Sequence, residues 1–288
     1  MMASIQKSSQ KTVGLFVTCL VDMFRPEVAT SAVRLLKKCG FQVVISKHQT
    51  CCGQIAFNNG DRDTAHKIAR NLIYDFRHCD YIVAPSTSCA DMVINHYDKL
   101  FPHAESLGHL FGYNYHHVDK DEDLPHRANI FRSQFYELSD FLYHIVNFVP
   151  DNLSSYLGHK KIIYHDSCTS LRNSKTHIAA RGLLHRAGVN IIIPPDAANC
   201  CGFGGNFTTD FPNISETITD KKCHHILSTE ADTLLSAELG CLLHLAGRFG
   251  RRRDDIDIFH LIEFLDGEHH EQRIPPIVLS KTHRQPIA

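Results

Sequence analysis

The strongest constraint on the fold of this chain is a spacing of cysteines that occurs twice. Two adjacent pairs are each followed by glycine, at Cys51-Cys52-Gly53 and at Cys200-Cys201-Gly202. A single cysteine precedes each pair by the same distance, since 51 − 19 and 200 − 168 both equal 32. The three-cysteine pattern therefore recurs at a shift of 149 residues (168 − 19, 200 − 51, 201 − 52). Because only 11 of the 288 residues are cysteine, we interpret the chain as two copies of one unit.

The length of the chain also predicts two domains, at about 150 residues each. We place the first cysteine-rich unit at residues 1–150, and this range includes a linker and a bridging helix. The linker is predicted at Phe101–Arg127, which is rich in His, Gly, Pro and Asp, and the bridging helix at Gln134–Phe148. The second unit occupies residues 151–288 and ends in a C-terminal tail.

The composition is typical of a soluble globular protein, with 43% hydrophobic and 21% charged residues. The formal net charge of -1 supplies no field to hold a nucleic-acid backbone or an anionic membrane surface, so we expect no nucleic-acid partner. The first dozen residues contain no apolar signal segment, and no stretch approaches the roughly 20 apolar residues of a spanning helix. We therefore expect a cytoplasmic protein without an integral membrane segment.

Hydrophobic periodicity predicts an α/β fold in which each unit is a small parallel sheet flanked by helices. In the first unit the expected strands are Lys11–Thr18, Phe41–Ser46 and Tyr81–Ala84, and the expected helices are Pro26–Cys39 and Asp61–Phe76. In the second unit the expected strands are Lys161–Tyr164, Val189–Ile193 and Thr233–Ser236, and the expected helices are His177–Ala187 and Ile214–Leu227. Strands that alternate with helices pair in parallel, because each crossover returns the chain to the same edge.

Four cysteines in each unit follow the carboxyl ends of expected strands, and Cys241 is expected after a last strand at Leu239-Gly240. The carboxyl ends of parallel strands form one edge of the sheet, where ligands bind. Structural disulfides are rare in a reducing compartment, so we predict that these thiols are metal ligands. The eight predicted ligands are Cys19, Cys51, Cys52 and Cys89 in the first unit and Cys168, Cys200, Cys201 and Cys241 in the second.

Sulfur ligands suit zinc, copper(I) or iron-sulfur clusters. The chain lacks the Cys-x2-Cys pairs of most structural zinc sites and the cysteine run of bacterial ferredoxins, which disfavours a zinc ribbon and an ordinary ferredoxin domain. The three other cysteines, Cys39, Cys79 and Cys223, are predicted to pack in the core. Among the 21 histidines, only His165 is placed where it could touch a cluster or move a proton. A basic cluster at Arg248 and Arg251–Arg253 is expected to be a solvated face or a docking patch.

The sequence around the predicted ligands resembles the CCG, or cysteine-rich domain, family. Within that family it is most similar to the lactate-utilisation iron-sulfur protein A group, and related modules occur in the iron-sulfur subunit of glycolate oxidase and in the cysteine-rich subunit of heterodisulfide reductase. The resemblance covers about residues 11–265. The matching runs are Phe16–Phe24 (FVTCLVDMF), Thr50–Gln54 (TCCGQ), Pro85–Cys89 (PSTSC), His165–Cys168 (HDSC) and Asn199–Gly205 (NCCGFGG).

The resemblance implies an oxidoreductase: an iron-sulfur electron-transfer subunit of a cytoplasmic complex that oxidises L-lactate to pyruvate. It implies one or two 4Fe-4S clusters per chain on the eight cysteines. The chain shows no Gly-x-Gly-x-x-Gly after a strand, so the oxidation of the small hydroxyacid is expected to need other subunits, among them a ferredoxin-like iron-sulfur protein.

One departure from the family limits what the resemblance implies. In the cysteine-rich subunit of heterodisulfide reductase the unit closes with Cys-x-x-Cys and holds a non-cubane cluster with five thiolates, whereas here Ser86 and Glu238 stand at the penultimate position. Four cysteines per unit suffice for an ordinary cluster, so the non-cubane type is not expected. The alternatives are an iron-sulfur subunit for glycolate or disulfide chemistry, a cluster in only one unit, and a zinc-stabilised structural subunit.

Overall fold

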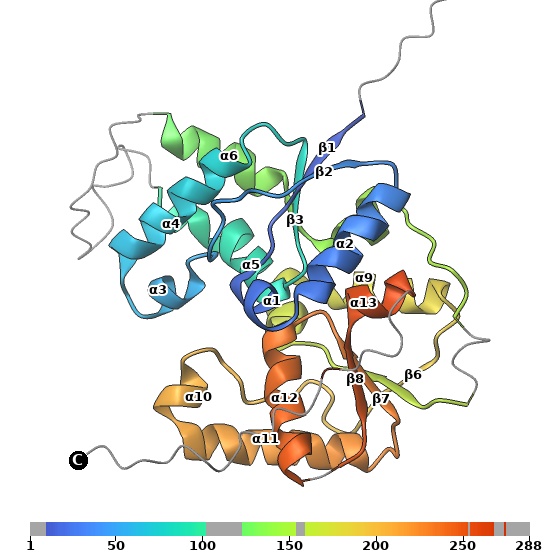
Figure 1. Ribbon diagram of the computed structural model, residues 1–288. Helices are drawn as coiled ribbons and strands as arrows, with labels where there is room; N and C mark the ends of the chain where they lie inside the picture. The colour runs from blue at the N-terminus through green and yellow to red at the C-terminus, as the bar shows by residue number, and fades with distance from the viewer. Residues whose placement is uncertain (1–9, 102–122, 154–158, 253, 268–273, 275–288) are drawn as a thin grey trace, which may run out of the picture. The chain divides into compact units, whose positions relative to one another are not determined.

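The computed structural model describes residues 10–101, 123–153, 159–252, 254–267 and 274. The chain divides after Phe148 into two compact units, and each contains a four-stranded, fully parallel sheet (Figure 1). The predicted fold class, two tandem α/β units built on small parallel sheets, is confirmed. No helix among the described residues combines the length and the apolar character needed to cross a membrane.

The sheet of the first unit has the strand order β2-β1-β3-β4. In Figure 1, helix α2 lies on one side of this sheet and α4, α5 and α6 lie on the other, as right-handed crossovers require. The strands are β1 (Thr12–Leu15), β2 (Gln42–Val44), β3 (Tyr81–Ala84) and β4 (Phe135–Glu137). The helices are α1 (Cys19–Phe24), α2 (Pro26–Lys38), α3 (Gln54–Asn58), α4 (Arg62–Asp75), α5 (Thr87–His96), η1 (Tyr97–Lys99), α6 (Leu124–Ser133), α7 (Leu138–Asp140) and η3 (Phe141–Ile145).

The second unit repeats this plan with the strand order β6-β5-β7-β8. Its strands are β5 (Ile162–Tyr164), β6 (Ile191–Ile192), β7 (Thr233–Ser236) and β8 (Asp257–His260). Its helices are η4 (Ser170–Ser174), α9 (His177–Arg186), α10 (Phe207–Asp210), α11 (Pro212–Leu227), α12 (Leu239–Arg252) and α13 (Leu261–Asp266).

Local sequence signals account for most of these elements. Helix α2 begins at Pro26, whose fixed φ suits the first helical position, and Gly40 follows the helix with φ 86°. Asp61 caps α4 by accepting a hydrogen bond from the Thr64 N–H at 3.0 Å. The central strands are apolar on both faces because helices cover both, and β7 is buried along its whole length.

Two elements differ from the sequence prediction. The bridging helix expected at Gln134–Phe148 is wrong in its first part, where Phe135–Glu137 form strand β4, and the helical part is limited to residues 138–145 (α7 and η3). The expected last strand at Leu239-Gly240 is also wrong: these residues begin helix α12, and the fourth strand is β8. Both sheets therefore gain an edge strand of only three or four residues, too short to show the alternation that marks a strand.

Parts of the expected linker and tail lie outside the described residues. Of the linker at Phe101–Arg127, residues 102–122 are not described, and Leu124–Arg127 belong to α6. Of the tail, Ile274 is described: it is buried, and its N–H donates to the Ile258 carbonyl at 2.8 Å. Among the cysteines predicted to pack in the core, Cys79 and Cys223 are buried, whereas Cys39 caps the end of α2 and is half-buried.

A buried carboxyl group at the end of β4 makes the first unit sensitive to pH. Glu137 is 1% exposed and accepts hydrogen bonds from the Ser139 hydroxyl and, at 3.1 Å, from the Asp140 N–H. Burial raises the pKa of this carboxyl from 4.5 to about 7 in spite of these bonds. The folded state therefore holds the proton more tightly than the unfolded chain, and the stability contribution is complete below pH 4.5 and lost as the pH rises to about 7.

We expect Glu137→Gln to remove this part of the pH dependence. A rise of this size corresponds to about 3 kcal/mol of unfolding free energy between pH 4.5 and 7. Urea unfolding at pH 5 and pH 8 should show a smaller difference for Glu137→Gln than for the parent chain. The control is Glu27→Gln on the half-exposed first turn of α2. An unchanged pH slope in the Glu137 variant would contradict the prediction.

Candidate metal centre

The four predicted ligands of the first unit come together at the carboxyl edge of its sheet. Cys19 begins α1 directly after β1, and Cys89 lies in the first turn of α5 after β3. The pair Cys51-Cys52 forms the loop before α3. The side chains are linked by hydrogen bonds from Cys19 to Cys51, between Cys51 and Cys52, and between Cys52 and Cys89. Cysteines up to 70 residues apart in sequence (89 − 19) thus form one contiguous thiol cluster.

Backbone N–H groups surround this cluster. Gly53 has φ 86°, in the left-handed region, and its N–H donates to the Cys51 sulfur at 3.3 Å. Ser86 caps α5 by accepting a hydrogen bond from the Cys89 N–H at 3.3 Å. The residue at the family's fifth-ligand position therefore has a structural role in this unit. The Gly53 N–H stabilises negative charge on the Cys51 sulfur, and donors of this kind tune a bound metal centre.

Hydrogen bonds among three of the thiols shift their pKa values in opposite directions. Hydrogen bonds from Cys19, Cys52 and the Gly53 N–H hold the pKa of Cys51 well below its usual range. The same contact with Cys51, together with burial, raises the pKa of the Cys19 thiol, and that of Cys52 rises for the same reasons. The neighbouring donors thus stabilise the thiolate form of Cys51. Four adjacent thiolates repel one another, so all four ionise together only when a cation is bound between them. The donor set fits a metal ion or an iron-sulfur cluster.

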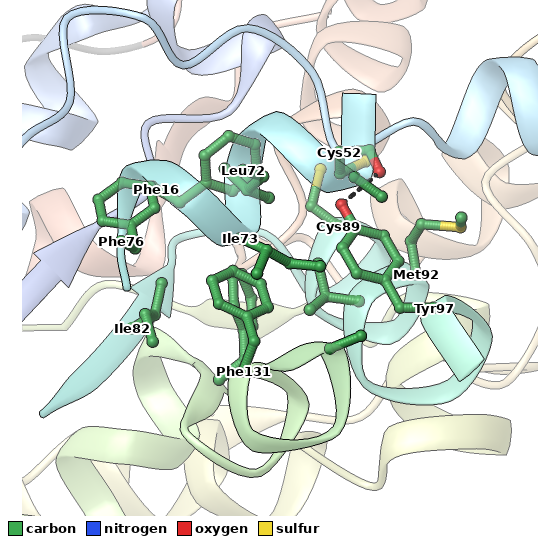
Figure 2. Close-up of a cluster of buried hydrophobic side chains, with 14 of the residues drawn as sticks. Phe16, Cys52, Leu72, Ile73, Phe76, Ile82, Cys89, Met92, Tyr97 and Phe131 are labelled. Carbon is green, nitrogen blue, oxygen red and sulfur yellow. Dashed lines mark hydrogen bonds between the residues drawn. The ribbon is translucent and has the colours of Figure 1, made fainter. Parts of the chain in front are cut away.

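A tyrosine outside the cysteine motifs supports the loop that carries the pair. Tyr97 is fully buried at the end of α5, and its hydroxyl donates to the Cys52 carbonyl oxygen at 3.0 Å (Figure 2). Figure 2 shows Cys52 and Cys89 beside the Tyr97 ring. Burial raises the pKa of the Tyr97 hydroxyl, so it stays a donor. The ring stacks on Phe131 at a centroid distance of 6.4 Å.

We expect Tyr97→Phe to loosen the Cys51-Cys52 loop while leaving the core packed. The phenylalanine ring keeps the stacking, but the buried Cys52 carbonyl loses its donor, which costs about 1–3 kcal/mol. Denaturant unfolding measures this loss, and the retention of bound metal during dilution reports on the loop. The matched control is Tyr136→Phe, a change at a half-buried position of β4. Equal effects for the two variants would contradict a role for the Tyr97 hydroxyl.

The second unit also gathers its four predicted ligands. Cys241 lies in the first turn of α12, and its sulfur is 2.9 Å from that of Cys201. Cys200 contacts both Cys168 and Cys201. The Gly202 N–H donates to the Cys200 sulfur at 3.3 Å, which repeats the Gly53 contact of the first unit. The structure therefore brings together all eight sequence-predicted residues, four in each unit.

Two residues of the second unit differ in charge or polarity from their counterparts in the first unit. Glu238, at the family's fifth-ligand position, is buried directly before α12. The hydrogen bond from Cys201 lowers the pKa of Cys241, but burial and the Glu238 carboxylate outweigh it, and the net shift is upward. His165 is 2% exposed, and one of its ring nitrogens lies within 4.8 Å of the Cys201 and Cys241 sulfurs, which are also within this distance of each other.

A polar cradle holds the Cys200-Cys201 loop against α11. The Ser215 hydroxyl donates to the Gly202 carbonyl at 2.8 Å, and the Thr219 hydroxyl donates to the Ser215 carbonyl at 2.7 Å. His244 lies 2.8 Å from the Thr219 hydroxyl oxygen. Ser215, Thr219 and His244 line a cavity of about 360 Å³ beside the loop. Sequence reasoning missed this cradle and Tyr97, because both act through tertiary contacts that no local motif marks.

Two arginines of the predicted basic cluster lie on α12 and pair with acids of their own unit. Arg248 contacts Asp220 and Glu216, each at 2.5 Å, and Arg252 contacts Asp254 at 2.9 Å. Arg253 lies outside the described residues. These ion pairs favour the interpretation as a solvated face.

Comparison with known proteins agrees with the duplicated site. The model of the cysteine-rich domain named CCG matches residues 13–94 and again residues 162–246, so both copies carry the signature. The chain belongs to the CCG cysteine-rich domain family. Each match spans one thiol cluster and the strands that position it.

Members of the CCG family similar to this chain carry the name lactate utilization protein A. "Lactate utilization protein A 2" of Bacillus cereus (strain Q1) is 36% identical over 254 residues, which is 88% of this chain and 97% of that protein. "Lactate utilization protein A" of Shouchella clausii is 35% identical over 257 residues, or 89% and 99% of the two chains. Among solved structures, a putative Asp/Glu racemase from Yersinia pestis aligns over 89% of this chain and 96% of its own with 11% identity, but its TM-score of 0.36 is too low to carry an argument.

Proposed function

We propose that this protein is an iron-sulfur electron-transfer subunit of a complex that oxidises L-lactate to pyruvate. The observation that carries the proposal is the duplicated cluster of four thiols at a sheet edge. Four thiolates are the ligand set of a 4Fe-4S cluster, and one such cluster per unit accounts for all eight cysteines. The substrate comes from the names of the relatives, which are lactate utilization proteins.

The residues of each unit have distinct tasks in this proposal. Cys19, Cys51, Cys52 and Cys89 hold a cluster in the first unit, and Cys168, Cys200, Cys201 and Cys241 hold one in the second. A bound cluster supplies one-electron transfer. The Gly53 and Gly202 N–H groups stabilise negative charge on sulfur, and the largely buried Cys52, Cys89, Cys201 and Cys241 keep water from one side of each site.

Partner subunits are part of the proposal. Oxidation of a hydroxyacid releases two electrons, whereas clusters pass electrons singly, so a further centre must accept the pair. We infer that other subunits bind the hydroxyacid and that a ferredoxin-like iron-sulfur subunit exchanges electrons with this chain. The eleven cysteines are all free, which favours a cytoplasmic complex.

The test is the metal and sulfide content of the anaerobically purified chain, with electron paramagnetic resonance spectra before and after dithionite. Two clusters predict about eight iron and about eight sulfide per chain, and a cluster in only one unit predicts about four of each. Stoichiometric zinc without sulfide would overturn the proposal in favour of a structural subunit. Assays with reconstituted partners then compare lactate with glycolate and with a disulfide, and activity on lactate is the expected result.

A further inference from the structure

The two units differ at a buried position that faces the thiols. The backbone N–H of Phe16 donates to the Val83 carbonyl at 2.9 Å, and the N–H of His165 donates to the Leu235 carbonyl at 2.7 Å. The two residues are also separated by the repeat shift of 149 (165 − 16). Each residue directly follows a central strand and lies three residues before the first ligand cysteine of its unit. Both side chains are 2% exposed or less. One copy of the unit therefore carries a phenyl ring where the other carries an imidazole.

The surroundings of the two rings differ in the same way. Phe16 belongs to an apolar core (Figure 2). Its ring packs edge-on against that of Phe135 at a centroid distance of 6.4 Å. In the second unit the buried Lys222 lies near His165, and its ammonium group donates to the Ala197 carbonyl at 2.8 Å. Gly53 packs on Ala65 of α4, and Gly202 packs on Ser215 of α11 in the same way. The two helices are therefore related by a shift of 150 residues (215 − 65). At this shift, Leu72 of the first unit is the counterpart of Lys222 in the second. At these two equivalent positions the first unit has apolar residues and the second has polar or charged ones.

His165 is held in place without a hydrogen-bond partner for its ring. Its backbone is fixed at both ends of the residue, since its N–H donates to Leu235 and its carbonyl accepts from the Ser236 hydroxyl at 2.8 Å. Neither ring nitrogen is hydrogen-bonded to any of the described residues. A buried imidazole without a partner is costly, and the residues that the structure describes supply no hydrogen-bond partner for this ring. The nearest candidate ligand atoms are the Cys201 and Cys241 sulfurs, within 4.8 Å.

We propose that His165 is a nitrogen ligand of the metal centre in the second unit. The inference rests on the proposed function, because it takes that centre to be an iron-sulfur cluster. The second unit then offers five donor side chains and the first offers four. An ordinary cluster has four iron sites, so the imidazole takes the place of one of the four thiolates. This replacement lowers the negative charge of the cluster, and histidine ligation raises the reduction potential. The positive charge of the buried Lys222 ammonium group also raises the reduction potential of a nearby cluster. The two units therefore hold centres of unequal potential.

Pulsed electron paramagnetic resonance on the full-length, dithionite-reduced chain tests the ligand directly. Protein with natural-abundance nitrogen is compared with protein carrying 15N-histidine. The expected result is a strong nitrogen coupling that changes with the label. His165→Phe copies the residue of the first unit, so it should abolish the coupling and lower the potential of one of the two centres. His185→Gln, an exposed change on α9, should alter neither.

The outcomes separate this inference from the proposed function. Iron and sulfide near the amounts for two clusters, with no strong nitrogen coupling, would overturn the histidine ligand and leave the electron-transfer role standing. A chain without iron and sulfide would overturn the proposed function and the inference with it. Where His165→Phe fails to fold, the isotope comparison on the unaltered chain still decides. A coupling that persists in a folded His165→Phe chain also overturns the inference.

Discussion

Cys201→Ala is expected to remove the iron-sulfur cluster of the second unit and to leave that of the first unit in place. Cys201 is 2% exposed, it contacts Cys200, and its sulfur lies 2.9 Å from that of Cys241. Its loss removes the buried thiolate that contacts both Cys200 and Cys241, so iron and sulfide per chain should fall to about half. Cys52→Ala is the reciprocal change, because Cys52 is equally buried between Cys51 and Cys89. Each variant should retain the signal of the other unit.

The matched control for Cys201→Ala is Cys223→Ala. Cys223 is fully buried on α11, but the charged groups around it are those of Arg252, Asp220, Asp254 and Arg248 rather than the ligand thiols. Its removal should cost stability through lost packing and leave the iron content unchanged. Iron, sulfide and thermal unfolding are measured on all three variants. Equal loss of iron from Cys223→Ala would mean that misfolding, not ligation, explains the Cys201 result.

The sequence was sufficient to predict the repeat and the central strands. The spacing of the cysteines divides the chain into two units, and the runs Tyr81–Ala84 and Thr233–Ser236 coincide with β3 and β7. The edge strands β4 and β8 were not predicted, because their sequences lack a clear strand pattern. In β4 the apolar residues continue as Leu138, Phe141 and Leu142, a spacing that also fits a helix, and β8 includes Asp257 and His260, which break the apolar run.

The convergence of the eight cysteines could be predicted because their positions after strands depend only on topology. The supporting residues could not, since each depends on a contact that is distant in sequence. Tyr97 reaches the Cys52 carbonyl across 45 residues. The sequence indicated His165 by its place three residues before Cys168, but the contrast with Phe16 in the other copy was not used. An alignment of the chain with itself at a shift of 149 would have given this signal.

Gly202→Ala is expected to destabilise its unit far more than Gly53→Ala destabilises the other. Both glycines have a left-handed φ, 92° and 86°, and alanine there costs about 1–2 kcal/mol. The surroundings differ. A Cβ on Gly202 would lie 2.4 Å from the Thr219 hydroxyl oxygen and 2.7 Å from the Ser215 carbonyl oxygen, whereas one on Gly53 would meet nothing closer than 3.5 Å.

The close approach in the second unit adds a steric cost on top of the backbone strain. Overpacking of this kind costs about 1–3 kcal/mol, and the contact with the Ser215 carbonyl cannot be relieved by a side-chain rotation. The Ser215–Gly202 hydrogen bond is expected to break as the loop is displaced from α11, which moves Cys200 and Cys201. The variant should therefore lose iron from the second unit as well as stability.

The double variant Gly202→Ala/Thr219→Ala separates the two steric contacts. Removing the Thr219 hydroxyl relieves the contact at 2.4 Å but leaves the backbone contact at 2.7 Å, so we expect only partial recovery of the unfolding free energy. Denaturant unfolding and iron content are measured for Gly53→Ala, Gly202→Ala and the double variant. Equal losses in the two single variants would show that the loop moves away from α11 without cost. Full recovery in the double variant would show that the Ser215 carbonyl imposes no constraint on the Cys200-Cys201 turn.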